Sequence, residues 1–224
     1  MFELRRALVG ALLALCAGTV LASHGIAPPS FDDETTLTHQ DATHIAMVTW
    51  WSKSDLKDIL PDDTDPAEMA KFVAALQGYA IFGLVDVKLT STDISASDAA
   101  RAALRSSARL TLGDRPARSP VREADLPERV RHELELIRPT MSNVLGKFGG
   151  AIEFVVFKDG DANGVSLADP AGNVDVVLAF DQESFSWHLP LVSTLPLRID
   201  RATGDTFPGD YEFSPFTGHK LETK

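Results

Sequence analysis

The segment DPAEMAKFVAALQGYAIFGLVDVKL, residues 65–89, decides the fold class of this chain. Asp65 is a natural helix N-cap, and Gly78 can close the helix that begins there. Between them, four apolar side chains recur with the spacing of one helical face: Met69, Phe72, Val73 and Leu76. Residues 79–89 then form an apolar, β-rich run that is typical of a buried strand. A helix that leads directly into a buried strand predicts helices packed on a sheet.

Further helices and strands are expected on both sides of this segment. β-branched and aromatic residues over 44–51 predict a strand. An alanine-rich run over 97–105 is compatible with a helix, and residues 108–112 have the pattern of a further strand. A long helix is predicted from Asp125 to Gly149, with a kink at Pro139. Three more strands are expected over 152–157, 174–180 and 184–189. We therefore expect an α+β fold, with an antiparallel β-sheet or sandwich, two packed helices and a small C-terminal β-hairpin or ribbon.

The N-terminus has the features of an export signal. Arg5 and Arg6 precede a short apolar run over 7–20, and small residues lead up to a cleavage point after Ala22. The run is too short to span a bilayer, which takes roughly 20 residues. These features predict a Sec-type signal peptide over residues 1–22, and an uncleaved membrane anchor is the alternative. The arginine pair also resembles the core of a twin-arginine signal, although Leu4 replaces the usual Ser or Thr.

The cysteine content favours a bacterial type of exported protein. Cys16 is the only cysteine, and it lies inside the predicted signal peptide. Leu15 stands where lipidation of Cys16 would require a small residue, which disfavours a lipoprotein. After cleavage the chain would have no disulfide, unlike most small secreted domains of eukaryotes. We expect a periplasmic or secreted protein with no transmembrane segment after signal cleavage.

The rest of the chain is expected to divide into three parts. Residues 23–40 are polar and contain two consecutive prolines, which predicts a flexible tether. Residues 41–195 hold the predicted helices and strands of the main α+β domain. Residues 196–224 are expected to form the separate C-terminal hairpin or ribbon.

The formal net charge of −11 bears on the class of partner. An acidic protein argues against binding to nucleic acid or to an anionic membrane surface, which both require basic patches. Basic side chains gather in one stretch only, and they are Arg101, Arg105, Arg109, Arg115 and Arg118. A solvated face paired with nearby carboxylates is the favoured interpretation of this stretch, and a binding patch is the alternative.

One loop has the spacing of a calcium-binding segment. Residues 159–164 read DGDANG, so that oxygen-bearing side chains alternate before a glycine that permits a sharp turn. This pattern resembles the first half of the calcium loops of EF-hands, although Pro170 occupies the position of the bidentate Glu. The candidate ligands are Asp159, Asp161, Asn163 and Asp169. A plain hairpin turn is the alternative, because Asp-Gly and Asn-Gly are also favoured turn sequences.

The C-terminus contains a short internal repeat. DRATGDTF at 200–207 and SPFTGHKL at 214–221 share a polar-x-x-Thr-Gly-x-x-apolar pattern. Over residues 197–221 this repeat resembles the paired knuckles of a zinc ribbon, which read Cys-x-x-Cys-Gly. The resemblance implies a ribbon whose metal ligands have been replaced, because zinc prefers thiolate or imidazole. The four ligand positions hold Asp200, Thr203, Ser214 and Thr217. Glycine turns and packing of Tyr211 and Phe213 would then replace the metal, and two independent hairpin turns are the alternative.

Three common catalytic and nucleotide-binding motifs are absent from the sequence. It has no Gly-x-Ser-x-Gly elbow, phosphate-binding glycine loop or His-Glu-x-x-His pair. We therefore expect an exported, non-enzymatic binding or interaction domain for a protein or small-molecule ligand, without a cofactor other than a possible Ca²⁺. Two alternatives stay open: a calcium-binding or calcium-stabilised extracytoplasmic protein, and a hydrolase whose site no motif reveals.

Overall fold

The computed structural model describes residues 25–52, 64–89, 98–144, 146–160, 166 and 168–224. Within them lie ten strands: β1 (Thr36–Gln40), β2 (His44–Trp51), β3 (Tyr79–Lys88), β4 (Arg109–Leu112), β5 (Glu153–Lys158), β6 (Val176–Phe180), β7 (Glu183–Trp187), β8 (Arg198–Ile199), β9 (Thr206–Phe207) and β10 (Glu222–Thr223). The α-helices are α1 (Phe31–Thr35), α2 (Pro66–Leu76), α3 (Asp98–Ser107) and α4 (Glu128–Val144). Short 3-10 helices are η1 (Glu123–Asp125), η2 (Gly146–Ala151) and η3 (Val192–Thr194). The predicted α+β class is confirmed.

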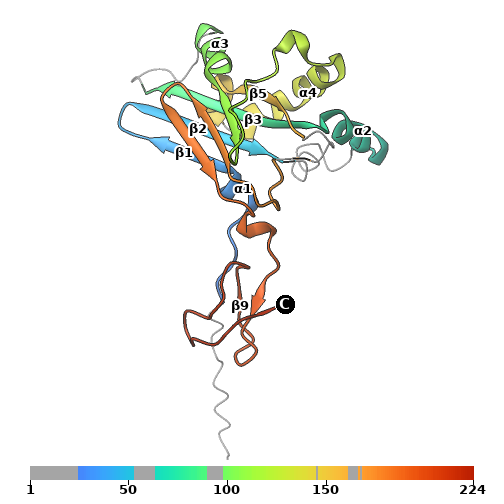
Figure 1. The fold of residues 1–224 in the computed structure, drawn as a ribbon. Coiled ribbons are helices and arrows are strands. Elements are labelled where there is room, and N and C mark those ends of the chain that lie inside the picture. The colour runs from blue at the N-terminus through green and yellow to red at the C-terminus, as the bar shows by residue number, and fades with distance from the viewer. Residues whose placement is uncertain (1–24, 53–63, 90–97, 145, 161–165, 167) are drawn as a thin grey trace, which may run out of the picture.

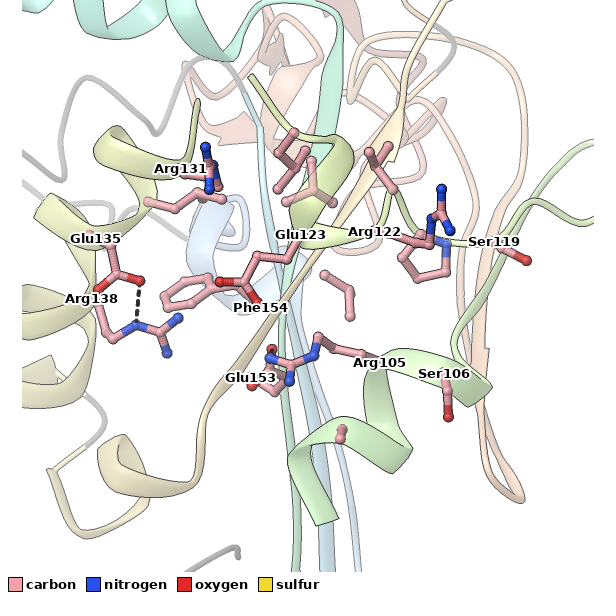
Figure 2. Close-up of a pocket in the computed structure, with 17 residues that line it drawn as sticks. Arg105, Ser106, Ser119, Arg122, Glu123, Arg131, Glu135, Arg138, Glu153 and Phe154 are labelled. Carbon is pink, nitrogen blue, oxygen red and sulfur yellow. Dashed lines mark hydrogen bonds and ion pairs between the residues drawn. The ribbon is translucent and has the colours of Figure 1, made fainter. Parts of the chain in front are cut away.

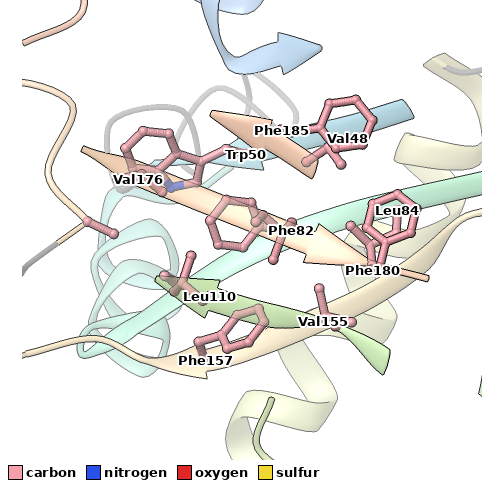
Figure 3. Close-up of a cluster of buried hydrophobic side chains, with 14 of the residues drawn as sticks. Val48, Trp50, Phe82, Leu84, Leu110, Val155, Phe157, Val176, Phe180 and Phe185 are labelled. Atoms are coloured by element: carbon pink, nitrogen blue, oxygen red, sulfur yellow. The ribbon is translucent and has the colours of Figure 1, made fainter. Parts of the chain in front are cut away.

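Two antiparallel sheets form the body of the molecule (Figure 1). The larger sheet has the strand order β1-β2-β3-β5, and the smaller has the order β4-β6-β7. Their facing sides enclose one hydrophobic core, which is rich in aromatic rings (Figure 3). Trp50 packs against Phe82 and Trp187 there, with ring centroids 6.0 and 5.7 Å apart. Of the two arrangements expected from the sequence, a single sheet or a sandwich, the structure has the sandwich.

The larger sheet is covered on its other face by helices. Phe72 and Leu76 of α2 and Val130 and Ile137 of α4 are buried against it in a second core. Trp51 also belongs to this second core, because adjacent strand residues face opposite sides of a sheet. β3 and β5 are thus buried on both faces, which explains why their sequences read as nearly continuous apolar runs.

The helices begin and end for local reasons that the sequence contains. The Asp65 carboxylate accepts hydrogen bonds from Ala67 N and Glu68 N, so it caps α2 as predicted. Gly78, with φ at +89°, turns the chain from α2 into β3. Pro139 lies inside α4, which continues past it to Val144. Asp125 belongs to η1 and not to α4, which begins at Glu128.

The expected tether over residues 23–40 is wrong for residues 31–40. These residues form α1 and β1, and β1 pairs with β2 along its whole length. Glu34 anchors α1, since its carboxylate accepts hydrogen bonds from Val192 N and Ser193 N at 2.8 and 2.7 Å. The sequence pattern missed this strand because β1 is a partly exposed edge strand with only one inward apolar residue, Leu37.

The C-terminal residues form a separate small sheet at one end of the body, as Figure 1 shows. Its strand order is β10-β8-β9, and both pairs are antiparallel. The N-terminal segment contacts it, because Ile26 N donates to Thr206 O at 3.0 Å. The small C-terminal β-unit expected from the sequence is confirmed.

Candidate functional site

A pocket of about 420 Å³ opens beside β5, between α3 and α4 (Figure 2). This volume falls at the lower end of the range of small-molecule sites, roughly 300–1,000 Å³. β5 is the last strand of the larger sheet, so its outer edge has no neighbouring strand. The lining includes five buried apolar residues: Leu126, Leu134, Phe154, Val155 and Val156.

The chain before η1 covers only part of the edge of β5. Val121 N donates to Val156 O at 2.7 Å, and Arg118 Nη1 donates to Lys158 O at 3.1 Å. On the inner side, Asp159 N donates to Gly78 O at 2.8 Å. Backbone groups alternate along a strand, so those of Phe154 point outward, like those of Val156.

The backbone N–H and C=O of Phe154 have no hydrogen-bond partner within the part of the chain that the structure describes. Phe154 is nevertheless only 6% exposed. Buried backbone groups are nearly always paired with protein, water or ligand. The N–H and C=O of Phe154 can therefore form hydrogen bonds with a ligand in the pocket.

A buried ion pair supports one side of the pocket. Arg105 Nη1 on α3 lies 2.6 Å from Glu153 Oε1, and the Glu153 side chain is 3% exposed. Burial raises the pKa of Glu153 above its ordinary value, and the hydrogen bond from Arg105 opposes that rise. The pair fixes α3 against the start of β5, and removing Arg105 would leave a buried carboxylate without its partner.

The other charged side chains at the pocket differ in their pairing (Figure 2). Arg138 Nε lies 3.5 Å from Glu135, and the Arg138 guanidinium lies 4.8 Å above the Phe154 ring. Arg122 pairs with Asp125 at 2.6 Å. By contrast, Glu123 and Arg131 line the pocket and their side chains bond to nothing in the described structure. Both are exposed, so one free anion and one free cation face the same cavity.

A second cavity of about 360 Å³ adjoins the first. The two cavities share Arg105, Arg138 and Glu153. Arg101 also lines the second cavity, and its Nη1 donates to Gly150 O at 3.0 Å. The basic stretch noted in the sequence therefore divides: Arg101 and Arg105 border the cavities, whereas Arg109 donates to the carbonyls of Ser106 and Ala108.

The predicted calcium ligands are only partly described. Asp161 and Asn163 lie outside the described residues, so the loop itself is not defined. The Asp159 carboxylate accepts hydrogen bonds from Ser166 Oγ and from Ala168 N. The Asp169 carboxylate is exposed and accepts a bond from Ala171 N. The calcium site stays a prediction.

The C-terminal repeat forms two turns with matching hydrogen bonds. Asp200 N and Ser214 N each donate to the carbonyl five residues ahead, and Gly204 N and Gly218 N donate back to the carbonyls of Asp200 and Ser214. The two apolar residues that end the repeats, Phe207 and Leu221, are both buried. The two segments are therefore structurally equivalent turns.

Asp200 joins the two turns of the C-terminal repeat. Its buried carboxylate accepts a hydrogen bond from Thr217 Oγ1 at 2.7 Å and lies 3.2 Å from His219 Nδ1. These bonds, that of Thr217 above all, lower the pKa of Asp200. Tyr211 stacks on Phe207, but the expected packing of Phe213 is wrong, since Phe213 is 53% exposed.

A chain of polar contacts links the two sheets of the sandwich. His39 Nδ1 lies 2.6 Å from Glu183, His44 Nε2 lies 2.5 Å from Asp86, and His44 Nδ1 lies 3.8 Å from Glu183. These side chains come from β1, β2, β3 and β7, so they connect the two sheets. Among the described residues, no three His, Cys, Asp or Glu side chains are arranged to hold a metal ion.

Comparisons with known proteins add little to this geometry. Neither a family model nor a curated protein matched the sequence. A solved structure that it resembles is a crystal structure of a novel protein of unknown function from Burkholderia pseudomallei K96243. The similarity has a TM-score of 0.33 at 11% identity, and it covers 73% of this chain and 82% of that chain. Among the helices that the structure describes, none has the length and apolarity needed to cross a membrane.

The pocket could not be predicted from the sequence. Its residues come from α3, η1, α4 and β5, which are far apart in the sequence and carry no shared motif. The concentration of arginines was the one available signal, and it indicated Arg105 but not Arg131 or Arg138. The unpaired edge of β5 could be recognised only once the strand order was known.

Proposed function

We propose that this protein is an exported binding domain that takes a small ligand with an apolar body into the pocket beside β5. The observation that carries the proposal is the combination of an apolar lining, formed by Phe154 and its neighbours, with several guanidinium groups at the same cavity. An apolar pocket with a few convergent polar groups is the usual form of a ligand site. The predicted signal peptide supports export as the setting for this activity.

The charges at the pocket favour a ligand that carries at least one acidic group. Arg131 and Arg138 on α4 both line the cavity, and guanidinium groups bind carboxylates through two parallel hydrogen bonds. Arg138 also lies over the Phe154 ring, so it stands at the boundary between the apolar lining and the charged groups. Octanoate, which joins an apolar chain to a carboxylate, is therefore a suitable first probe.

The experiment measures octanoate binding by titration calorimetry on the wild-type protein and two matched variants. Ala102 and Ala103 are neighbouring exposed residues of α3, but only Ala102 lines the pocket. Ala102→Trp should fill the cavity and weaken binding by about tenfold or more, whereas Ala103→Trp should leave it unchanged. Equal binding by both variants would show that the pocket is not the ligand site, and no binding of octanoate to the wild type would exclude a simple apolar acid as the ligand.

A further inference from the structure

We infer that the ligand is a short peptide in an extended conformation, which adds to the free edge of β5 at Phe154. This inference rests on the proposed function, because it names the chemical class of ligand for the same pocket. Extended peptides bind exposed sheet edges through main-chain hydrogen bonds, and neighbouring pockets select their side chains. The pocket beside β5 offers each of these elements.

The backbone of Phe154 supplies the main-chain part of the site. Its N–H and C=O point away from β3, and neither has a partner in the described part of the chain, although Phe154 is 6% exposed. A residue in an antiparallel neighbouring strand donates one hydrogen bond and accepts another at such a position. A fatty acid or a simple amphiphile cannot satisfy both groups at this spacing, whereas the central residue of a peptide can.

The side chains supply an apolar contact and two charges. Leu126, Leu134 and the Phe154 ring can bury an apolar side chain of the peptide. Glu123 on η1 can bind a free ammonium group, and Arg131 on α4 can bind a carboxylate, because neither is engaged elsewhere in the described structure. Figure 2 shows these two side chains at the same cavity, and they come from different elements. A short peptide with both termini free carries matching charges.

The test uses the tripeptide Ala-Leu-Ala and four related probes in titration calorimetry with the full protein. N-methylation of the central leucine removes its hydrogen-bond donor and should weaken binding about tenfold. Acetylation of the N-terminus and amidation of the C-terminus each remove one charge of the peptide. Each should weaken binding about fivefold, which corresponds to the strongest contribution usual for an exposed ion pair. Octanoate, the fourth probe, reports whether the pocket binds an apolar acid at all.

Variants assign each charge to its partner. Glu123→Gln should weaken binding of the free tripeptide about fivefold and leave the acetylated peptide unaffected. Arg131→Gln should likewise weaken binding of the free tripeptide about fivefold and leave binding of the amidated peptide unaffected. Arg115→Gln is the control, because it also removes one arginine charge but Arg115 is an exposed residue outside both cavities.

The outcomes separate this inference from the proposed function. Tighter binding of the free tripeptide than of its N-methylated form and of octanoate supports the inference. Equal binding of the methylated and unmethylated peptides, or binding of octanoate without the tripeptide, overturns it and leaves the pocket as a ligand site. If neither octanoate nor the tripeptide binds, both proposals are wrong.

Discussion

Gly83 is the position at which the packing of the larger sheet can be tested most directly. It lies in the middle of β3, opposite Phe154 of β5. A Cβ at this position would lie 2.8 Å from Cδ1 of Ile152 and 2.9 Å from Cη2 of Trp51. The Trp51 ring cannot simply move away, because it packs against the Phe154 ring with centroids 4.9 Å apart. Gly83→Ala should therefore displace side chains of the second core, which lies between the larger sheet and the helices (the helix-side core).

The expected cost follows from two opposing effects. Overpacking a dense core costs about 1–3 kcal/mol. Replacing glycine by alanine also restricts the unfolded chain, which offsets about 0.4–1 kcal/mol of that cost. The difference between these effects spans about 0–2.6 kcal/mol. We expect Gly83→Ala to lower the free energy of unfolding by roughly the middle of that range, about 1.3 kcal/mol, and to lower the melting temperature by a few degrees. Because Trp51 contacts Phe154, binding to the pocket should weaken as well.

Urea unfolding, followed by tryptophan fluorescence, measures this change. The matched control is Gly150→Ala, because a Cβ there meets no atom within 4 Å and the backbone is not in the left-handed region. That substitution should be neutral or stabilise the protein by up to about 1 kcal/mol. If Gly83→Ala proves as stable as Gly150→Ala, with the same dependence on urea, then the close approach of Trp51 and Ile152 to β3 does not constrain the core.

Three further predictions concern ionisable groups and metal. The pKa of Glu153 is raised, chiefly by burial, so the folded protein holds this proton more tightly than the unfolded chain, and stability should fall as pH rises from 4.5 through the folded pKa. Thermal melts across this range should show that Glu153→Gln loses the fall, and an unchanged profile would contradict the assignment. The pKa of Asp200 is lowered from its ordinary value of 3.8, chiefly by the hydrogen bond from Thr217. The stability that this carboxylate adds to the folded state is therefore present above pH 3.8 and is lost as the pH falls through the lower folded pKa. Asp200→Asn should be less stable than the wild type at pH 7 and should lose this acid sensitivity; equal melting temperatures at pH 7 would count against the bridge between the two turns. If the loop at 159–169 binds calcium, a calcium concentration of 100 times Kd should stabilise the folded protein by about 2.7 kcal/mol in a thermal melt, and Asp161→Ala should remove this stabilisation. Equal melting temperatures with calcium and with chelator would show that the loop is a turn without a calcium site.

Local patterns predicted most of the fold of the main domain. The helix capped by Asp65 and the strands β2 and β3 follow from periodicity within single segments, and each was expected close to its observed bounds. β1 was not expected, because its five residues carry one inward apolar side chain and depend on β2 for their conformation. Periodicity detects elements that bury a face of their own, and it fails for edge strands that neighbouring elements hold in place.

The candidate site could not be predicted in the same way. Arg105 and Glu153 are far apart in the sequence, and their contact exists only because α3 lies beside β5. The free edge of β5 depends on the strand order β1-β2-β3-β5, in which the fourth strand of the chain joins a different sheet. In contrast, the C-terminal repeat was visible in the sequence because its equivalence is local: the same residue spacing produces the same turn twice.

The position of the pocket follows from the way in which the two cores share one sheet. β5 is buried on both faces, with Val155 in the sandwich core and Phe154 and Val156 in the helix-side core. A strand that is covered on both faces and ends a sheet has only its edge left to bind another molecule. Val121 occupies this edge at Val156, and the edge at Phe154 stays open between α3 and α4. Glu123 and Arg131, which have no partner in the described structure, line the cavity at this open part of the edge. A peptide brings both the backbone hydrogen bonds that Phe154 lacks and the charges that Glu123 and Arg131 lack, and this is the physical reason to look first for a peptide.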